Sequence, residues 1–153
     1  MKKLLILVAL IALAGSALAQ DAVTVIKSDA LKWADVPTLP KGAQIATLLG
    51  DPTKAGEVVV QRLKFPANYQ VPPHTHPYIE TNTVISGSVG FGMGEKFEKK
   101  GEMLMPGAFL GNPAKHAHYA WTENEEAIIQ IQYIGPRGID FPNPADDPRK
   151  KSN

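Results

Sequence analysis

Residues 74–87 read His-Thr-His-Pro-Tyr-Ile-Glu-Thr-Asn-Thr-Val-Ile-Ser-Gly, and this stretch carries the clearest chemical information in the chain. His74 and His76 are two residues apart, so on an extended strand their side chains project from the same face. Glu80 keeps the same parity, although Pro77 fixes its own φ and lacks an N–H donor, so Glu80 would reach the histidines from beyond a bend. His118, in a later segment, repeats this spacing with His116, so every histidine lies in one of two pairs.

Imidazole nitrogens and a carboxylate oxygen are ligands typical of first-row divalent metals. We predict that one divalent transition metal is bound, with Fe, Mn, Zn, Ni and Cu all open, and that its ligands are His74, His76, Glu80 and His118. His116 is a candidate catalytic residue, either as a hydrogen-bond donor near a ligand, as a proton shuttle or as a substrate contact. The alternative is that the histidines flank prolines and turns at a surface and share no ion.

Short apolar and β-branched runs separated by Gly, Pro and Asn make up most of the chain. Such runs predict strands, and no long stretch beyond the N-terminal segment has a clear helical period. Many short strands with turn signals between them are typical of an all-β sandwich or barrel. The expected strands cover residues 44–49, 57–65, 80–86, 89–93, 102–104, 108–111, 116–121 and 127–134.

The connections between these strands carry recognisable turn residues. Ser86-Gly87-Ser88 and Pro106-Gly107 each place a glycine where a turn needs a positive φ, and both predict hairpins. The charged residues 95–100 fit either a short helical turn or an excursion between strands. Residues 142–153 are polar and rich in proline, so we expect an extended or disordered tail.

Composition excludes several classes of function. Sixteen Lys and Arg balance fifteen Asp and Glu, so nothing indicates a nucleic-acid partner. The absence of cysteine from the sequence excludes disulfides, thiolate metal sites and thiol nucleophiles. The length suits a single domain, which we expect over residues 20–141.

The N-terminal segment has the three parts of a secretory signal peptide. Two lysines follow Met1, an apolar run extends from Leu4 to Ala14, and an Ala-x-Ala site ends at Ala19. A membrane anchor is the alternative, but the apolar run is shorter than the roughly 20 residues that span a bilayer. We therefore expect residues 1–19 to be removed, and the protein to be exported to the periplasm or the extracellular space without a remaining membrane association.

Two motifs resemble those of the cupin superfamily. The first is His74-x-His76-x(3)-Glu80-x(6)-Gly87, and the second is Gly107-x(5)-Pro113-x-Lys115-x(2)-His118. The resemblance covers roughly residues 65–122 and implies a double-stranded β-helix, which is a jelly-roll barrel, with the four metal ligands inside it. It is also compatible with a homodimer that pairs through edge strands.

Three positions depart from the cupin pattern. Asn68 and Lys115 stand where the family has glycine, and Thr122 stands where asparagine is common. Asparagine tolerates a positive φ, so the turn at Asn68 can survive. Tyr119 and Trp121 have the opposite parity to His118, so we expect them to pack on the other face of their strand.

The resemblance leaves more than one function open. The first hypothesis is a metal-dependent enzyme of dioxygenase, isomerase or decarboxylase type that acts on a small oxygen-rich molecule. The second is a non-catalytic cupin that binds or senses a small ligand or a metal, and a third is a structural domain with a vestigial site. Because function resides in the site rather than in the fold, the fold cannot choose among them.

Overall fold

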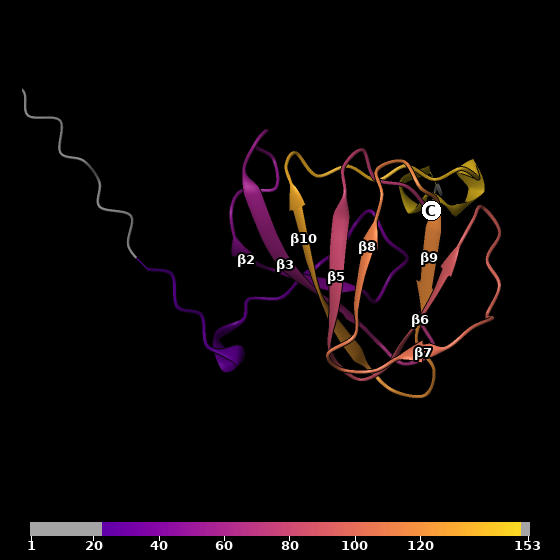
Figure 1. The fold of residues 1–153 in the computed structure, drawn as a ribbon, viewed down its shortest axis with the longest axis horizontal. Helices are drawn as coiled ribbons and strands as arrows, with labels where there is room; N and C mark the ends of the chain where they lie inside the picture. The colour runs from indigo at the N-terminus through magenta and orange to yellow at the C-terminus, as the bar shows by residue number, and fades with distance from the viewer. Residues whose placement is uncertain (1–22, 151–153) are drawn as a thin grey trace, which may run out of the picture.

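The computed structural model describes residues 23–150, which fold into two antiparallel β-sheets (Figure 1). The only helices among the described residues are short 3-10 helices, and none of them is long and apolar enough to cross a membrane. The predicted signal peptide lies outside the described residues. The elements are η1 (Ser28–Ala30), β1 (Ala34–Asp35), β2 (Gln44–Leu49), β3 (Val58–Phe65), β4 (Gln70–His74), β5 (Glu80–Ser86), β6 (Val89–Met93), β7 (Met103–Leu104), β8 (Phe109–Asn112), β9 (His118–Trp121), β10 (Ala127–Ile134), η2 (Pro144–Asp146) and η3 (Pro148–Lys150), where η marks a 3-10 helix.

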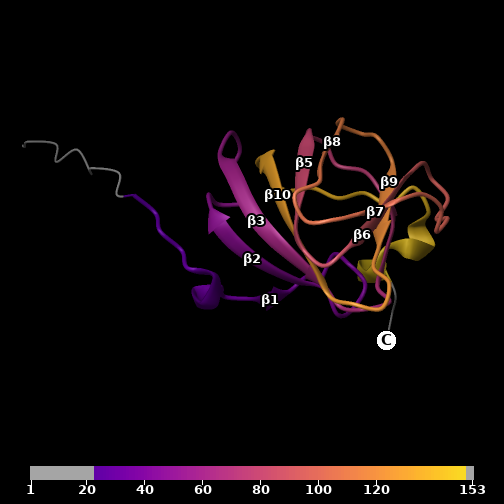
Figure 2. The ribbon, with the colours of Figure 1, turned by 60° about the horizontal axis from the view of Figure 1, so that its bottom comes forward.

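The two sheets face each other and enclose the core (Figure 2). One sheet has the strand order β1-β2-β3-β10-β5-β8 and the other has the order β4-β9-β6-β7. Long-range antiparallel pairing of this kind, with neighbours distant in sequence, is the arrangement of a jelly roll. The all-β prediction and the jelly-roll fold are confirmed.

The central strands show why the sequence folds this way. β3 pairs with β10 along its whole length, from Ala127 opposite Phe65 to Ile134 opposite Val58. Along both strands, buried side chains alternate with more exposed ones, as the two-residue period of a strand requires. The buried set of one sheet therefore meets the buried set of the other in a single apolar core.

Strand bounds agree closely with the sequence prediction except at β1 and β4, which were not predicted. β4 contains Pro72 and Pro73, which argue against a strand in the sequence. The structure tolerates them because β4 is an edge strand of its sheet, and its pairing with β9 shifts register between Val71 and His74. A proline without an N–H donor does least harm at such an edge.

The prediction of two hairpins is wrong. Gly87 and Gly107 do adopt positive φ angles of 67° and 91°. However, the turn at Gly87 joins β5 to β6, the turn at Gly107 joins β7 to β8, and in each case the two strands belong to different sheets. The turns are therefore corners of the barrel, which a local pattern cannot distinguish from a hairpin.

The turn before β4 keeps its shape without glycine. Asn68 has a φ of 57°, as its tolerance of the left-handed region predicts. The fully buried Thr122 holds this turn, because its hydroxyl accepts a hydrogen bond from the Tyr69 N–H at 2.9 Å and donates one to the Pro66 carbonyl at 2.6 Å. The turn is thereby fixed to the end of β9.

Tyr119 and Trp121 pack on the opposite face from His118, as predicted. Their rings lie over two glycines of β6, and a Cβ added to Gly90 would stand 2.0 Å from Trp121, while one added to Gly92 would stand 2.2 Å from Tyr119. Phe97 covers both rings, with centroid distances of 5.1 Å and 6.1 Å. Residues 95–100 contain no helix and form the excursion that carries Phe97.

The chain beyond β10 folds back onto the barrel. Thr75 and Asp140 form an isolated antiparallel bridge, with N–H to O distances of 2.8 Å and 3.0 Å in the two directions. The following residues form η2 and η3, and the Asp147 carboxylate is paired with Arg149 at 2.7 Å. The expectation of an extended or disordered tail is therefore wrong for residues 144–150, because these local contacts order the segment.

Candidate metal centre

Three imidazole rings meet inside the barrel. His74 ends β4, His76 follows the bridge at Thr75, and His118 begins β9 opposite His74. One ligand atom from each ring lies within 4.8 Å of the others, and all three side chains are buried. Donors bound at roughly 2.1 Å from one ion lie about 3 to 4 Å apart, so this cluster is close to a coordination sphere.

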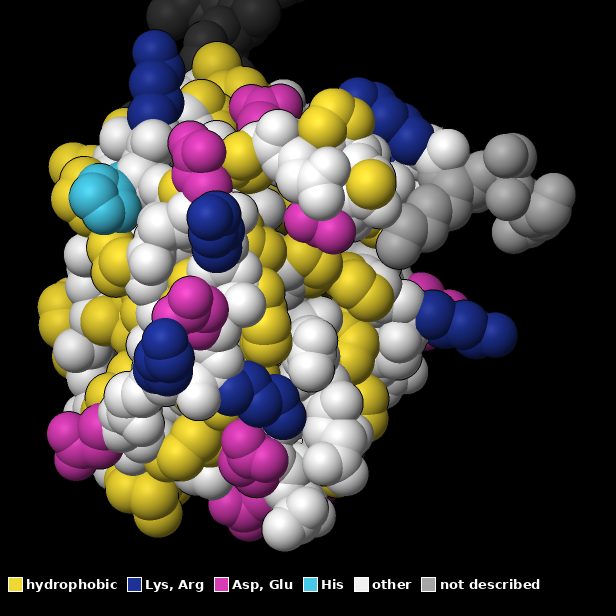
Figure 3. All heavy atoms as spheres, turned by 90° about the vertical axis from the view of Figure 1, so that its right-hand side faces the viewer, with side chains coloured by type: hydrophobic (Ala, Val, Ile, Leu, Met, Phe, Trp, Pro, Cys, Tyr) yellow, Lys and Arg dark blue, Asp and Glu magenta, His cyan; other side chains and the backbone are white. Residues whose placement is uncertain are grey.

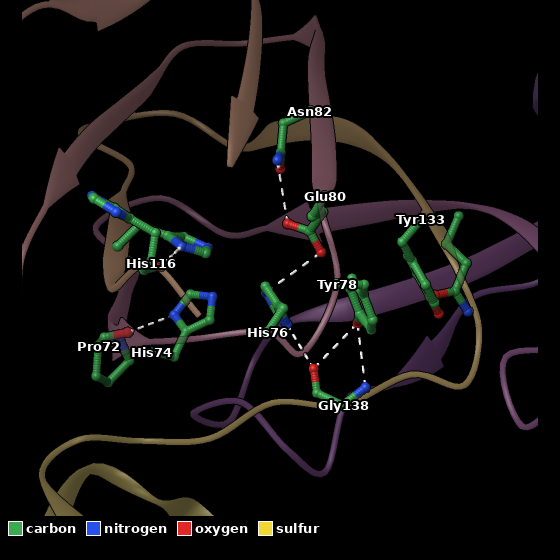
Figure 4. Close-up of polar contacts among 11 residues, drawn as sticks. Pro72, His74, His76, Tyr78, Glu80, Asn82, His116, Tyr133 and Gly138 are labelled. Carbon is green, nitrogen blue, oxygen red and sulfur yellow. Dashed lines mark hydrogen bonds and ion pairs between the residues drawn. The ribbon is translucent and has the colours of Figure 1, made fainter. Parts of the chain in front are cut away.

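Backbone carbonyls fix the orientation of all three rings. The Nδ1 atoms of His74 and His76 lie 2.8 Å and 2.6 Å from the carbonyl oxygens of Pro72 and Gly138, respectively (Figure 4). The Nδ1 atom of His118 lies 2.9 Å from the His116 carbonyl oxygen. A carbonyl can only accept, so each Nδ1 carries the proton and donates it. Each Nε2 is thereby left with a free lone pair, which is the tautomer that a metal ligand needs.

Burial keeps these imidazoles neutral. It is the largest cause that lowers the pKa of His76 and His118, and it lowers the pKa of His74 well below 6.5. Neighbouring positive charges lower the pKa of each ring further, whereas the hydrogen bonds to carbonyls oppose the shift. Near pH 7 the rings are therefore available as neutral ligands.

Glu80 reaches the cluster from beyond the predicted bend. It is the first residue of β5, only 5% exposed, and its Oε2 lies 3.5 Å from the Nε2 of His76 (Figure 4). Asn82 donates to its other oxygen at 3.2 Å. Burial is the largest cause that raises the pKa of Glu80 above 4.5. The mutually close group itself contains only the three histidines, so Glu80 stands beside it as a fourth donor.

The side chain of His116 lies outside the histidine cluster. Its side chain is exposed and is not part of the wall of the pocket around the cluster. What His116 contributes is its backbone carbonyl, which orients His118. The structure therefore gives no support to a proton-shuttle role for the His116 ring.

Comparison with known proteins identifies the family of the chain. The model of the DUF4437 family, described as a domain of unknown function, matches residues 15–135. The chain belongs to this family. No curated protein matches the sequence.

The solved structures that resemble it share the cupin fold. The polyketide cyclase RemF from Streptomyces resistomycificus has a TM-score of 0.69 and 19% identity, with 84% of this chain and 92% of that chain covered. An RmlC-like cupin from Ralstonia eutropha has a TM-score of 0.61 and 15% identity over 80% and 74% of the two chains. The DMSP lyase DddQ from Ruegeria pomeroyi has a TM-score of 0.61 and 17% identity, over 76% of this chain and 63% of that one. The DUF4437 protein is therefore a cupin in fold.

A pocket surrounds the histidine cluster of this cupin. The polar residues in its wall are the three histidines, Glu80, Asn82 and Arg137. Apolar side chains from both sheets form the rest, and they include Leu63, Val71, Phe91, Leu110, Ile129 and Ile131. Most ligand sites have this composition, in which a few polar groups orient a molecule inside an apolar cavity.

Several residues of the site were not identified from the sequence. Asn82 has the same parity as Glu80 on β5, so the strand period could have revealed it. Gly138 and Arg137 come from the segment after β10, and no spacing connects them to the histidines. Only the folded chain shows that the Gly138 carbonyl accepts hydrogen bonds from both His76 and the hydroxyl of Tyr78.

Proposed function

We propose that this cupin is a metal-dependent enzyme that acts on a small oxygen-rich molecule. The observation that carries the proposal is the shared arrangement of the three histidines, each with Nδ1 tied to a carbonyl and Nε2 free. A histidine buried for packing alone does not require this arrangement three times around one point.

The donor set fits a divalent transition metal. His74, His76 and His118 would supply neutral nitrogens and Glu80 a carboxylate, so that a bound divalent ion keeps a net charge near plus one. Fe, Mn, Zn, Ni and Cu all accept such ligands. A bound metal that prefers five or six ligands would leave one or two positions for substrate, and it would supply Lewis-acid polarisation of a substrate oxygen.

The chain's own groups would position the reaction. Asn82 holds one oxygen of Glu80 and directs the other toward His76, and the carbonyls hold the three rings. The apolar wall would exclude bulk water from a closed complex, which would strengthen electrostatic interactions inside the pocket. Tyr78 and Tyr133 donate their hydroxyl protons to the Gly138 carbonyl and to the Gln61 side chain, respectively.

A catalytic role is compatible with the fold, and the donor set beside a pocket supports it. Solved structures of this fold bear the names polyketide cyclase and DMSP lyase, although at under 20% identity they argue only that the fold accommodates such reactions. For the reaction itself we propose oxygenation, isomerisation or decarboxylation. We also propose that the enzyme works outside the cytoplasm, on the basis of the N-terminal sequence.

A small molecule is the partner that the surface favours. On the face shown in Figure 3, Lys and Arg side chains are interspersed with Asp and Glu, so this face has no continuous basic patch for nucleic acid. The pocket around the histidines, in contrast, has the lining of a small-molecule site, with a few polar groups set among apolar side chains.

The test is reconstitution of the purified protein with Fe(II), Mn(II), Ni(II), Cu(II) or Zn(II), followed by metal analysis and turnover of a metabolite panel. Oxygen uptake distinguishes oxygenation from the other two reactions. We expect about one metal per chain and turnover that His76→Ala abolishes. His116→Ala is the matched control and should keep its metal, because that ring is exposed.

Tight ligand binding without turnover in any metal form would instead identify a binding protein. Failure to retain any of the five metals would reject the proposed site.

A further inference from the structure

We infer that Arg137 forms an anion subsite in the metal pocket, and that the ligand of this cupin carries a carboxylate. The inference deepens the proposed function and rests on it for the role of the metal. It specifies which end of the molecule the protein itself recognises.

Arg137 occupies a fixed place at the wall of the pocket. It lies in the segment that follows β10, and it lines both the cavity around the histidines and a groove on the outside of the barrel. Its backbone N–H donates to the Pro52 carbonyl at 2.7 Å. One residue further on, the Gly138 carbonyl accepts from His76. The same short segment therefore anchors a predicted metal ligand and contributes Arg137 to the wall of the pocket.

The guanidinium of Arg137 has no acidic partner within residues 23–150. No carboxylate there lies within 4.0 Å of it, and its side chain takes part in none of the hydrogen bonds of that part of the chain. Arg149, which lines the same outer groove, contrasts with it, since Asp147 accepts from its Nε at 2.7 Å and from its Nη2 at 2.9 Å. The donors of Arg137 are therefore free for a ligand.

The charges around the pocket favour an anion. Glu80 is the only carboxylate in its wall, and a divalent ion held by three neutral imidazoles and Glu80 would retain positive charge. The charge of Arg137 adds to it, and this charge is among the causes that act on the pKa of His74, His76 and Glu80, after burial in each case. Arg137 lines the same pocket as the predicted ligands, so one small molecule in that pocket could reach both.

Carboxylate is the chemical group that this arrangement suits best. A guanidinium presents two parallel N–H donors that match the two oxygens of a carboxylate. The remaining wall is apolar, so the body of the molecule should be a short apolar chain with an oxygen donor placed for the metal. A 2-oxo or 2-hydroxy carboxylic acid has these parts.

The experiment compares 2-oxobutanoate with its neutral amide, 2-oxobutanamide, by calorimetry on the Zn(II)-loaded and the metal-free protein. We expect the wild type to prefer the acid by about 10- to 100-fold, the range of charge-assisted hydrogen bonds. Arg137→Gln should abolish the preference, and Arg137→Lys should restore only part of it. Arg62→Gln is the matched control, since Arg62 contacts Gln130 on a different surface of the barrel.

Each outcome separates this inference from the proposed function. An acid preference that survives in Arg137→Gln, or a wild type that binds neither compound or both equally, would overturn the inference even if zinc is bound stoichiometrically. If the wild type failed to bind zinc, the proposed metal site would be rejected. A preference for the acid that depends on Arg137 in the metal-free protein would still support the subsite. Unchanged zinc content in Arg137→Gln shows that the variant is folded.

Discussion

The three histidines are held by one kind of contact, an Nδ1–H that donates to a backbone carbonyl. These hydrogen bonds offset part of the free energy that burial of the rings costs. Glu80, in contrast, accepts a hydrogen bond only from the Asn82 amide. Spacing and parity grouped the histidines into two pairs, and the cupin resemblance implied that His118 rather than His116 joins His74 and His76. They could not predict the carbonyl from Gly138, because it arrives from a segment 62 residues away in sequence.

Replacement of Glu80 by Gln should stabilise the metal-free protein while it weakens metal binding. Burial raises the pKa of Glu80, so the folded state binds this proton more tightly than the unfolded state does. The ionised Glu80 carboxylate therefore lowers the free energy of unfolding as the pH rises above 4.5. This loss of stability is complete once the pH exceeds the raised pKa. The free energy of unfolding, measured with and without zinc, should show a gain for the metal-free variant at pH 7 that disappears at pH 4.

In the Glu80→Gln background the three buried histidines contribute a pH dependence of their own. Their pKa values are lowered on folding, so the unfolded chain binds the extra protons and stability falls as the pH drops below 6.5. If the free energy of unfolding of this variant rose as the pH was lowered from 6.5 to 5, the assignment of buried, neutral rings would be contradicted.

Lys115→Gly should stabilise the protein. Lys115 has a φ of 61°, in the left-handed region that costs a non-glycine residue about 1 to 2 kcal/mol, and its side chain is exposed. Part of the gain is offset by the greater freedom of glycine in the unfolded chain, so we expect about 0.5 to 1 kcal/mol. Chemical denaturation measures it, and Lys115→Ala, which keeps the Cβ, should give no comparable gain.

At the scale of elements, strands with an alternating pattern were predicted well, and β2, β5, β6 and β10 have the predicted bounds. The failures have one cause, which is that pairing across the barrel overrides local preference. β4 forms despite two prolines because its edge position spares their missing donors. The turns at Gly87 and Gly107 have the predicted conformation, but which sheet the next strand joins depends on the whole topology.

Gly92→Ala should disrupt the contact between β6 and β9. The added Cβ would stand 2.2 Å from the ring of Tyr119, which is only 5% exposed and is covered by Phe97. Overpacking of this kind costs about 1 to 3 kcal/mol. Gly111→Ala, in β8, is the control, since its Cβ would meet nothing within 4 Å. Equal thermal stability of the two variants would contradict the packing of this face.

The whole molecule places a polar cluster at the centre of an apolar barrel and closes it with the segment that follows β10. The sequence motifs cover the barrel but not this closure, which supplies Gly138, Ile139 and Arg137. Export and a homodimer through edge strands both stay predictions. The metal centre is the claim on which the proposed chemistry depends.

X-ray absorption spectroscopy of the zinc-reconstituted protein tests that claim most directly. We predict a first shell of three imidazole nitrogens and at least one oxygen at about 2.0 to 2.2 Å, with the oxygen signal altered in Glu80→Gln. A shell with fewer than three imidazoles, or one that His118→Ala leaves unchanged, would contradict the account.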